Sequence, residues 1–307
     1  MPLLAAYGAL AARNLGLLAV VLVKPANTAA PAVSGNTLIG STLTCSTGTW
    51  TGTPTITYSY QWQRGGSNIT GATSNSYVTA GADVGQAVTC TVTATNAVGN
   101  ASQASSNSVT VALPNLGDSF GGGYYAGQLS TSGNGVATHL LIVAPKASGE
   151  NSSKQWATGT GTTGKTSVID GPGNSAALNS SSYPAAQFCE GLTIGGYSDW
   201  YLPAKNELEI CYYTLKPTVD TNNTSSGTNT NAVPSRGSNY LSGTPGQTAI
   251  TAFKSGGSEV FAADAYWSST EYSSATAWEQ DFGYGSQYYY GVMTDSHYVR
   301  AVRRFVL

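Results

Sequence analysis

The chain has 307 residues and is nearly neutral, with 13 Lys and Arg against 15 Asp and Glu. It lacks the clustered positive charge that nucleic-acid binding requires, so no nucleic-acid partner is expected. Only 9% of the residues are charged. Gly, Ser, Thr and Asn occur throughout, which is typical of turn-rich β proteins and excludes a helical bundle.

The first 30 residues contain an apolar run, Leu15–Val23. This run is too short to span a bilayer, so no membrane insertion is expected. No positive charge precedes Arg13, and Lys24 ends the run. This pattern favours an uncleaved segment, residues 1–30, that attaches the chain to a neighbouring protein. A secretory signal peptide is the alternative, because small residues follow the run.

Residues 31–113 show short β-type runs between turn clusters. Val88, Cys90 and Val92 alternate with polar residues, as in a half-buried strand. The order Cys45, Trp62, Cys90 and the segments TLTCSTGTW, YSYQWQR and VTATNAVG resemble bacterial and phage immunoglobulin-like repeats. The resemblance implies a β-sandwich that serves as a spacer, with Trp62 in its core.

Residues 114–307 have an α+β pattern and are expected to form a second domain. THLLIVAP predicts a buried strand. SSYPAAQFCEGL predicts a helix with Ser182 as N-cap and Pro184 in its first turn. A second helix is predicted within 202–217, because Leu208, Cys211, Tyr212 and Leu215 follow helical spacing. A long polar loop, 219–247, precedes the closing strands predicted in YWSST, AWEQDF, QYYYGVM and YVRAVRRF.

Residues with catalytic or ligating chemistry are few. Gly159–Thr166 matches the phosphate-loop expression, but Gly171-Pro172-Gly173 would break any following helix after about one turn. We therefore expect an ordinary loop. His139 and His297 lie far apart, and Glu207 and Glu209 point to different helix faces. No catalytic residue, metal or cofactor is predicted.

The cysteines fall two in each half of the chain. Cys45 and Cys90 lie in the first half, and Cys189 and Cys211 lie on predicted helices with apolar neighbours in the second. Buried thiols, or at most one bridge in each domain, are favoured over a nucleophile. The sequence leaves the bridging open.

Three separated motifs carry a second resemblance, which covers residues 116–305. GGYSDWYLPAKNELE, YWSSTEYSSATAW and YVRAVRRF resemble the C-terminal lectin-like domains of bacterial collagen-like adhesins and phage fibre proteins, which have a C-type-lectin-like fold. The resemblance implies that Trp200, Leu202, Trp267, Trp278 and Phe282 are core residues. It also implies that Asp199, Asn206, Glu207 and Arg300 or Arg303 hold loops through buried polar contacts.

The chain departs from two related groups. It lacks the Glu-Pro-Asn or Gln-Pro-Asp tripeptide of calcium-dependent sugar-binding lectins, so a calcium-mediated sugar site is not expected. It also lacks an evident cysteine arrangement of formylglycine-generating enzymes. An enzyme of that fold is therefore an alternative without support from the residues.

Tyrosine, serine, glycine and aspartate crowd the segment Asp281–His297. Strand alternation predicts that Trp278 and Phe282 are buried while Glu279, Asp281 and Gly283 point outward. It also places Tyr288 and Tyr290 on one face and Tyr289 on the other. These residue types are those of antibody binding loops. Of the segment, only Gln287 and Met293 lie outside the set that randomising the first two bases of Asn codons would produce.

This composition resembles the variable regions of proteins diversified by retroelements. It predicts a ligand-binding face made of Tyr272, Ser273, Thr276, Glu279, Asp281, Tyr284, Ser286, Tyr288, Tyr289, Tyr290, Asp295 and His297.

The expected fold class is mainly β plus α+β: an attachment segment (1–30), an immunoglobulin-like sandwich (31–113) and a lectin-like head (114–307). The expected function is that of a non-enzymatic tail-fibre protein of a phage virion. The head would bind a host cell-surface receptor, protein or glycan, and would be a homotrimer. Residues 1–30 would bind other virion proteins. A secreted or surface-bound bacterial adhesin is the alternative.

Overall fold

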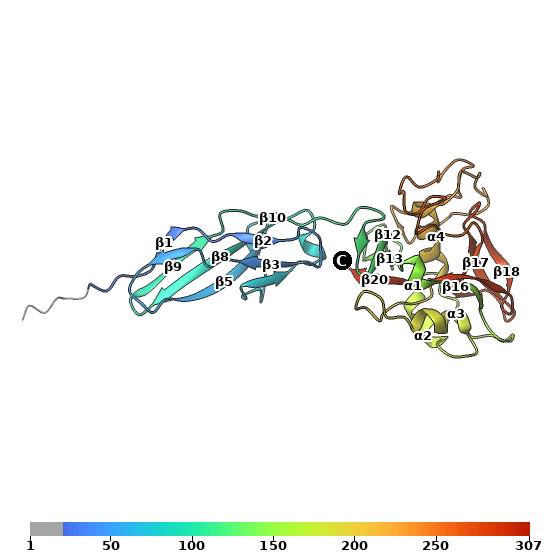
Figure 1. Cartoon of the computed structure of the whole chain (residues 1–307), viewed down its shortest axis with the longest axis horizontal. Coiled ribbons are helices and arrows are strands. Elements are labelled where there is room, and N and C mark those ends of the chain that lie inside the picture. The colour runs from blue at the N-terminus through green and yellow to red at the C-terminus, as the bar shows by residue number, and fades with distance from the viewer. Residues whose placement is uncertain (1–20) are drawn as a thin grey trace, which may run out of the picture. The chain divides into compact units, whose positions relative to one another are not determined.

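The computed structural model describes residues 21–307, so most of the expected attachment segment and of its apolar run lies outside the described residues. The chain divides into two compact units, which are described separately (Figure 1). The first ends at Val111, and the second comprises Ala80–Val84 and Ala112–Leu307. Within 21–307, no helix is long and apolar enough to cross a membrane.

The first unit is built from short strands that the turn clusters separate. They are β1 (Ala26–Ala29), β2 (Val33–Gly35), β3 (Thr42–Cys45), β4 (Thr49–Thr51), β5 (Thr57–Arg64), β6 (Ser67–Asn68), β7 (Ser76–Val78), β8 (Ala87–Asn96), β9 (Gly99–Ala104) and β10 (Val109–Thr110). One sheet has the order β10-β8-β5-β6, with β9 also on β8, and another has the order β2-β3-β7. β1 pairs with β4, so the β-structure begins before the expected boundary at residue 31.

The core of this unit follows from strand alternation. Along β8, Val88, Cys90 and Val92 are buried, as their spacing predicts. Trp62 of β5 is also buried, and its indole nitrogen donates to the Ser74 carbonyl over 2.9 Å. All four cysteines of the chain, Cys45 and Cys90 here and Cys189 and Cys211 in the second unit, are buried free thiols.

The second unit mixes strands and helices. Its strands are β11 (Ser119–Phe120), β12 (Gly123–Leu129), β13 (His139–Val143), β14 (Glu150–Gln155), β15 (Ala232–Val233), β16 (Ala265–Glu271), β17 (Thr276–Asp281), β18 (Gln287–Val292), β19 (Ser296–Arg300) and β20 (Val302–Val306). Its helices are η1 (Gly81–Asp83), α1 (Lys146–Gly149), α2 (Gly171–Ala177), α3 (Pro184–Glu190) and α4 (Lys205–Leu215). The sheets have the orders β11-β12-β13-β20 and β14-β19-β16-β17-β18.

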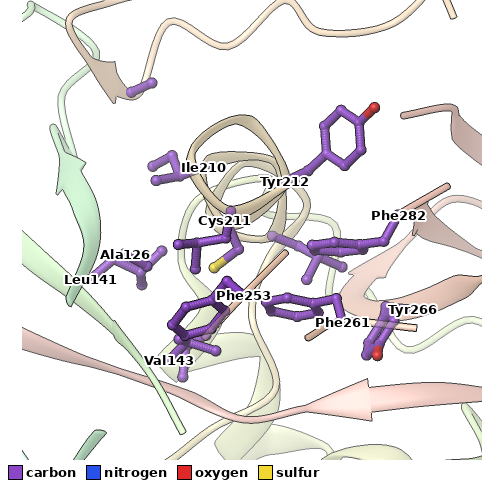
Figure 2. Close-up of a cluster of buried hydrophobic side chains, with 14 of the residues drawn as sticks. Ala126, Leu141, Val143, Ile210, Cys211, Tyr212, Phe253, Phe261, Tyr266 and Phe282 are labelled. Atoms are coloured by element: carbon purple, nitrogen blue, oxygen red, sulfur yellow. The ribbon is translucent and has the colours of Figure 1, made fainter. Parts of the chain in front are cut away.

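The sheet that contains β16 lies between two hydrophobic cores. On the α4 side, Tyr266 and Phe282 pack with Phe253, Phe261 and residues of α4, as Figure 2 shows. On the other side, Trp267 packs in a second core with residues of α3 and with Leu178, which follows α2. Because neighbouring residues of a strand point to opposite faces, a sheet covered on both sides buries its central strand completely. Every residue of β16 is accordingly buried.

Helix α4 confirms the predicted periodicity and is the central helix of the unit. Leu208, Cys211, Tyr212 and Leu215 are buried. Glu207 and Glu209 are buried as well, on different sides of the helix, because each carboxylate has its own cation. Glu207 accepts from Arg304 over 2.8 Å, and Glu209 pairs with Arg236.

Several local expectations were wrong. Gly171-Pro172-Gly173 begins α2 instead of breaking a helix, because proline fits the first helical turn and Asp170 caps it by accepting from the Gly173 amide. The N-cap of α3 is Tyr183, not Ser182. YVRAVRRF is not one strand, since Ala301 separates β19 from β20 in another sheet. The fold class, mainly β plus α+β, is confirmed.

Candidate binding face

The hairpin of β17 and β18 contains a bulge that gathers aromatic side chains. Ala277 pairs with Gly291 and Glu279 pairs with Tyr288, so Tyr289 and Tyr290 together stand opposite Trp278 alone. At such a bulge the alternation of side chains is interrupted. Tyr289 and Tyr290 consequently lie side by side, with ring centroids 4.1 Å apart and hydroxyls 2.6 Å apart. The expectation that they point to opposite faces is therefore wrong.

These residues form a contiguous group that we call the aromatic ladder: Trp278, Tyr272, Tyr289 and Tyr290. Tyr289 lies 4.4 Å from Tyr272 and 5.4 Å from Trp278, measured between ring centroids. Tyr272 meets Trp278 edge to face at 90°. Such pairs hold one another's orientation, so the ladder loses little side-chain entropy when it meets a partner.

The ladder is accessible. Tyr290 is 66% exposed and Tyr272 is 50% exposed, whereas Trp278 and Tyr289 are half-buried. The prediction that Trp278 is a core residue is thus wrong. Trp278 faces the same side of β17 as the buried Phe282, but it lies beside the first residue of α4. There Lys205 covers its ring, with the ammonium 4.6 Å from the ring centroid.

A second group of predicted residues lies on the opposite face of the sheet. Residues paired directly across strands share a face, so Tyr288 lies with Glu279 and Trp267, while Trp278 points the other way. The Tyr288 hydroxyl is 2.7 Å from that of Tyr284. This hydrogen bond raises the pKa of Tyr284 to about 12. The residues predicted as one site are therefore divided between two faces.

The second face is acidic. Burial, followed by the charges of Asp281, Asp264 and Asp295, raises the pKa of Glu279 to about 7. His297 Nε2 lies 3.2 Å from Glu279 Oε2, but that oxygen receives no hydrogen bond. Burial also lowers the pKa of His297. Among residues 21–307, no three His, Cys, Asp or Glu side chains are placed to hold a metal ion.

The remaining predicted residues fill turns. Ser273 and Thr276 join their hydroxyls over 2.8 Å in the turn between β16 and β17. Asp281 accepts from the Gly283 and Tyr284 amides, which shapes the turn between β17 and β18. Asp295 is exposed between β18 and β19. Ser286 is fully buried, so including it in an exposed face was wrong; its hydroxyl is bonded to the Asn223 amide.

Beside the ladder lies a hollow of about 210 Å³ that sequence reasoning missed. Its wall includes Trp278, Tyr289, Lys205, Gln287, Asn239 and Thr228. Two of these residues, Thr228 and Asn239, come from the loop predicted as 219–247. The sequence shows only a polar loop there, and no local pattern indicates which side chains turn toward the sheet.

Buried asparagines fix that loop against α4. Asn229 donates to the Asn206 carbonyl over 2.8 Å and to Glu209 over 2.5 Å. Asn206 in turn donates to Asn231 over 2.8 Å. Buried amides with all partners in place specify one conformation, and the wall of the hollow is consequently rigid.

The residues that the second resemblance implied as holding loops do make polar contacts, but the contact of Asp199 is not buried, because its side chain is 57% exposed. Arg303 holds Asp199 through two hydrogen bonds of 2.7 and 2.9 Å. Arg300 is buried and donates to both the carbonyl and the carboxylate of Glu259. Glu207 is bound by Arg304 instead of either of these.

The segment that matches the phosphate-loop expression is a loop, as expected, and its amides are occupied. Thr163 and Gly164 donate their backbone N–H groups to the buried Glu271 carboxylate over 2.7 and 2.9 Å. An internal carboxylate thus takes the place that an anion would need. These two amides are therefore not free to bind a nucleotide phosphate.

Comparisons with known proteins bear on the second unit. The family model of the Lcl C-terminal domain matches residues 150–303, half of the chain. No curated protein matches. The crystal structure of a fimbrial protein from Bacteroides ovatus ATCC 8483 aligns with 89% of this chain and 70% of that one, at 11% identity and a TM-score of 0.37. A TM-score of that size supports no statement about fold or function.

The family match includes the first two of the three motifs and most of the third, so a family relationship predicted from those motifs is confirmed at the level of this domain. The immunoglobulin-like, lectin-like and retroelement assignments stay predictions. The chain belongs to the family of proteins that carry the Lcl C-terminal domain.

Proposed function

We propose that this chain is an adhesin-like surface protein whose second unit binds a ligand on another surface through the aromatic ladder. One observation carries the proposal: mutually oriented aromatic rings, of which Tyr272 and Tyr290 are substantially exposed, lie on and beside the hairpin of β17 and β18, which pairs with the fully buried strand β16. Tyrosine offers a large contact area and a hydroxyl at a low cost in rotamer freedom. A rigid scaffold beneath it limits the entropy lost on binding.

More specifically, we propose that the chain is a receptor-binding tail-fibre protein of a phage virion. It would have no enzymatic activity and would assemble as a homotrimer. Three copies of one weak site on one particle would raise the overall affinity by avidity. A secreted or surface-bound bacterial adhesin is the second candidate. Finding the intact chain in purified particles would support the virion, whereas a cleaved N-terminus on mature protein at a bacterial surface would support the adhesin.

The retroelement hypothesis belongs to this proposal. It expects that a near-copy of the coding segment for residues 272–298 lies beside a reverse-transcriptase gene, with adenines at the differing bases. Tyr284, Tyr289 and Tyr290 would then be positions that tolerate substitution, since their side chains contribute little to the hydrophobic core. Neighbouring DNA without such a copy would contradict it.

The test is binding of the fluorescently labelled chain to a panel of bacterial cells, measured by flow cytometry. The double variant Tyr272→Ser/Tyr290→Ser removes two exposed rings of the ladder. We expect binding to fall at least about tenfold, since interface tyrosines are commonly worth more than 1 kcal/mol each.

The matched control is Tyr284→Ser/Tyr288→Ser, which removes two tyrosines from the same hairpin but on the opposite face. It is expected to bind as the unaltered chain does. Loss of binding in the control and retention in the ladder variant would place the ligand on the acidic face instead. Equal binding by both variants would refute a role for the hairpin.

A further inference from the structure

The hollow beside the ladder combines hydrogen-bonding groups with aromatic walls. The Thr228 hydroxyl donates to the side-chain oxygen Oδ1 of Asn239 over 2.8 Å. This leaves the two hydrogens of the Asn239 side-chain amide for another partner. Trp278 and Tyr289 supply apolar walls. Polar groups around an apolar face are what a specific small-molecule site requires.

Two donors in the wall, the Gln287 amide and the Lys205 ammonium, meet no hydrogen-bond acceptor among residues 21–307. The side-chain nitrogen of Gln287 is buried, and within the described chain it meets no acceptor. Lys205 holds its ammonium over Trp278, and across residues 21–307 no carboxylate lies within ion-pair distance of it. Burial lowers the pKa of Lys205. A buried donor without an acceptor is costly, so a ligand oxygen that accepts from the Gln287 amide would be favourable, and a second oxygen could accept from the half-buried Lys205.

We propose that the hollow binds a single pyranose ring of an uncharged glycan, without a metal ion. A pyranose has an apolar C–H face that suits an aromatic wall, and a rim of hydroxyl oxygens that accept from amides and ammonium groups. The volume of about 210 Å³ is below the usual range for drug-sized ligands, which agrees with one ring. The inference rests on the proposed function, because it names the ligand class for the ladder face.

An anionic ligand fits the hollow less well. Carboxylate, sulfate and phosphate groups are commonly bound by the paired N–H groups of an arginine guanidinium or by several cationic side chains. Lys205 is the one charged side chain of the wall, and its ammonium is engaged with the Trp278 ring. The buried Glu209 carboxylate also acts on Lys205 and offsets part of its charge.

The experiment measures binding of methyl glycosides to the full chain by saturation-transfer NMR and calorimetry, in the presence of EDTA. The probes are the methyl glycosides of glucose, galactose, mannose and N-acetylglucosamine, with glucuronic acid and N-acetylneuraminic acid as charged comparisons. We expect at least one neutral sugar to bind with a Kd of about 1 mM, since the site is small. The affinity should not depend on EDTA.

Variants locate the site. Lys205→Met keeps the apolar stem and removes the ammonium, and Gln287→Leu removes the unpartnered amide; each is expected to weaken sugar binding about tenfold. Val136→Ser changes an exposed residue of the same unit and should leave the affinity unchanged. If Gln287→Leu fails to fold, Asn239→Ala tests the same wall from the loop.

The outcomes are separable. Sugar binding that both variants weaken supports the inference. Binding of charged sugars alone, or affinities that neither variant changes, would overturn it. A chain that binds cells but no sugar would also overturn it and leave the proposed function standing. A chain that binds neither cells nor sugars would overturn both.

Discussion

The carboxyl group of Glu279 provides a test of the electrostatics beneath the hairpin. Its side chain is 10% exposed and lies against Trp267. Burial and the negative charges of three neighbouring aspartates raise its pKa from about 4.5 to about 7. Replacing it in Glu279→Gln keeps the shape and removes the charge. The new amide can donate to the surrounding carboxylates at every pH, whereas the glutamate can do so only when it is protonated.

The direction in which the stability changes with pH follows from proton binding. Because the pKa of Glu279 is higher in the folded state, the folded protein binds this proton more tightly than the unfolded chain. The resulting stabilisation is complete below about pH 4.5 and is lost as the pH rises to about 7. A shift of this size corresponds to at most about 3 kcal/mol. Water screens this partly accessible carboxyl, so about 1–2 kcal/mol is expected.

The assay is urea unfolding of the unaltered chain and of Glu279→Gln at pH 5, 6, 7 and 8, followed by tryptophan fluorescence. The difference in unfolding free energy should move in favour of Glu279→Gln by about 1–2 kcal/mol between pH 5 and pH 8, and then level off. Asp264→Asn removes one repelling charge and should shift this change to lower pH. His297 is present in all three proteins. A difference that does not vary with pH would refute the reasoning.

Three further predictions concern the scaffold. Gly291→Ala would place a methyl group 2.6 Å from the Trp267 ring and 2.7 Å from Glu279; thermal unfolding should show a loss of about 1–3 kcal/mol, and an unchanged midpoint would contradict this contact. Arg300→Met leaves the Glu259 carboxylate without its cation and leaves Glu150 with Lys146 alone. It should cost about 3–5 kcal/mol in urea unfolding, and a loss below 1 kcal/mol would argue against the buried pair. Millimolar ATP should not raise the thermal midpoint, because Glu271 occupies the loop amides; a rise would show that a phosphate displaces the carboxylate.

Regular patterns in the sequence predicted regular elements. The spacing of Leu208, Cys211, Tyr212 and Leu215 predicted α4, and the alternation along Val88, Cys90 and Val92 predicted β8. Both succeed because the apolar side chains line the face of the element that packs in the hydrophobic core, and this packing imposes the period of the element on the sequence. The family resemblance implied that Asp199 and either Arg300 or Arg303 make polar contacts, but it did not predict that Asp199 pairs with Arg303, and the two residues are far apart in the chain.

Irregular features could not be predicted in this way. The bulge at Tyr289 and Tyr290 breaks the period of two on which the face assignment depended. The exposure of Trp278 depends on where α4 begins, and α4 lies far away in the sequence. The hollow depends on how Thr228 and Asn239 are positioned by buried amides of a long loop, and no local pattern encodes such contacts.

The most direct test of the ladder is hydroxyl-radical footprinting of the chain, free and bound to the cells it recognises, read out by mass spectrometry for each residue. The account predicts that oxidation of Tyr272 and Tyr290 falls on binding, while the exposed Tyr58 of the first unit reacts equally in both states. Unchanged oxidation of Tyr272 and Tyr290 in the bound state would contradict the claim that the ladder touches the ligand.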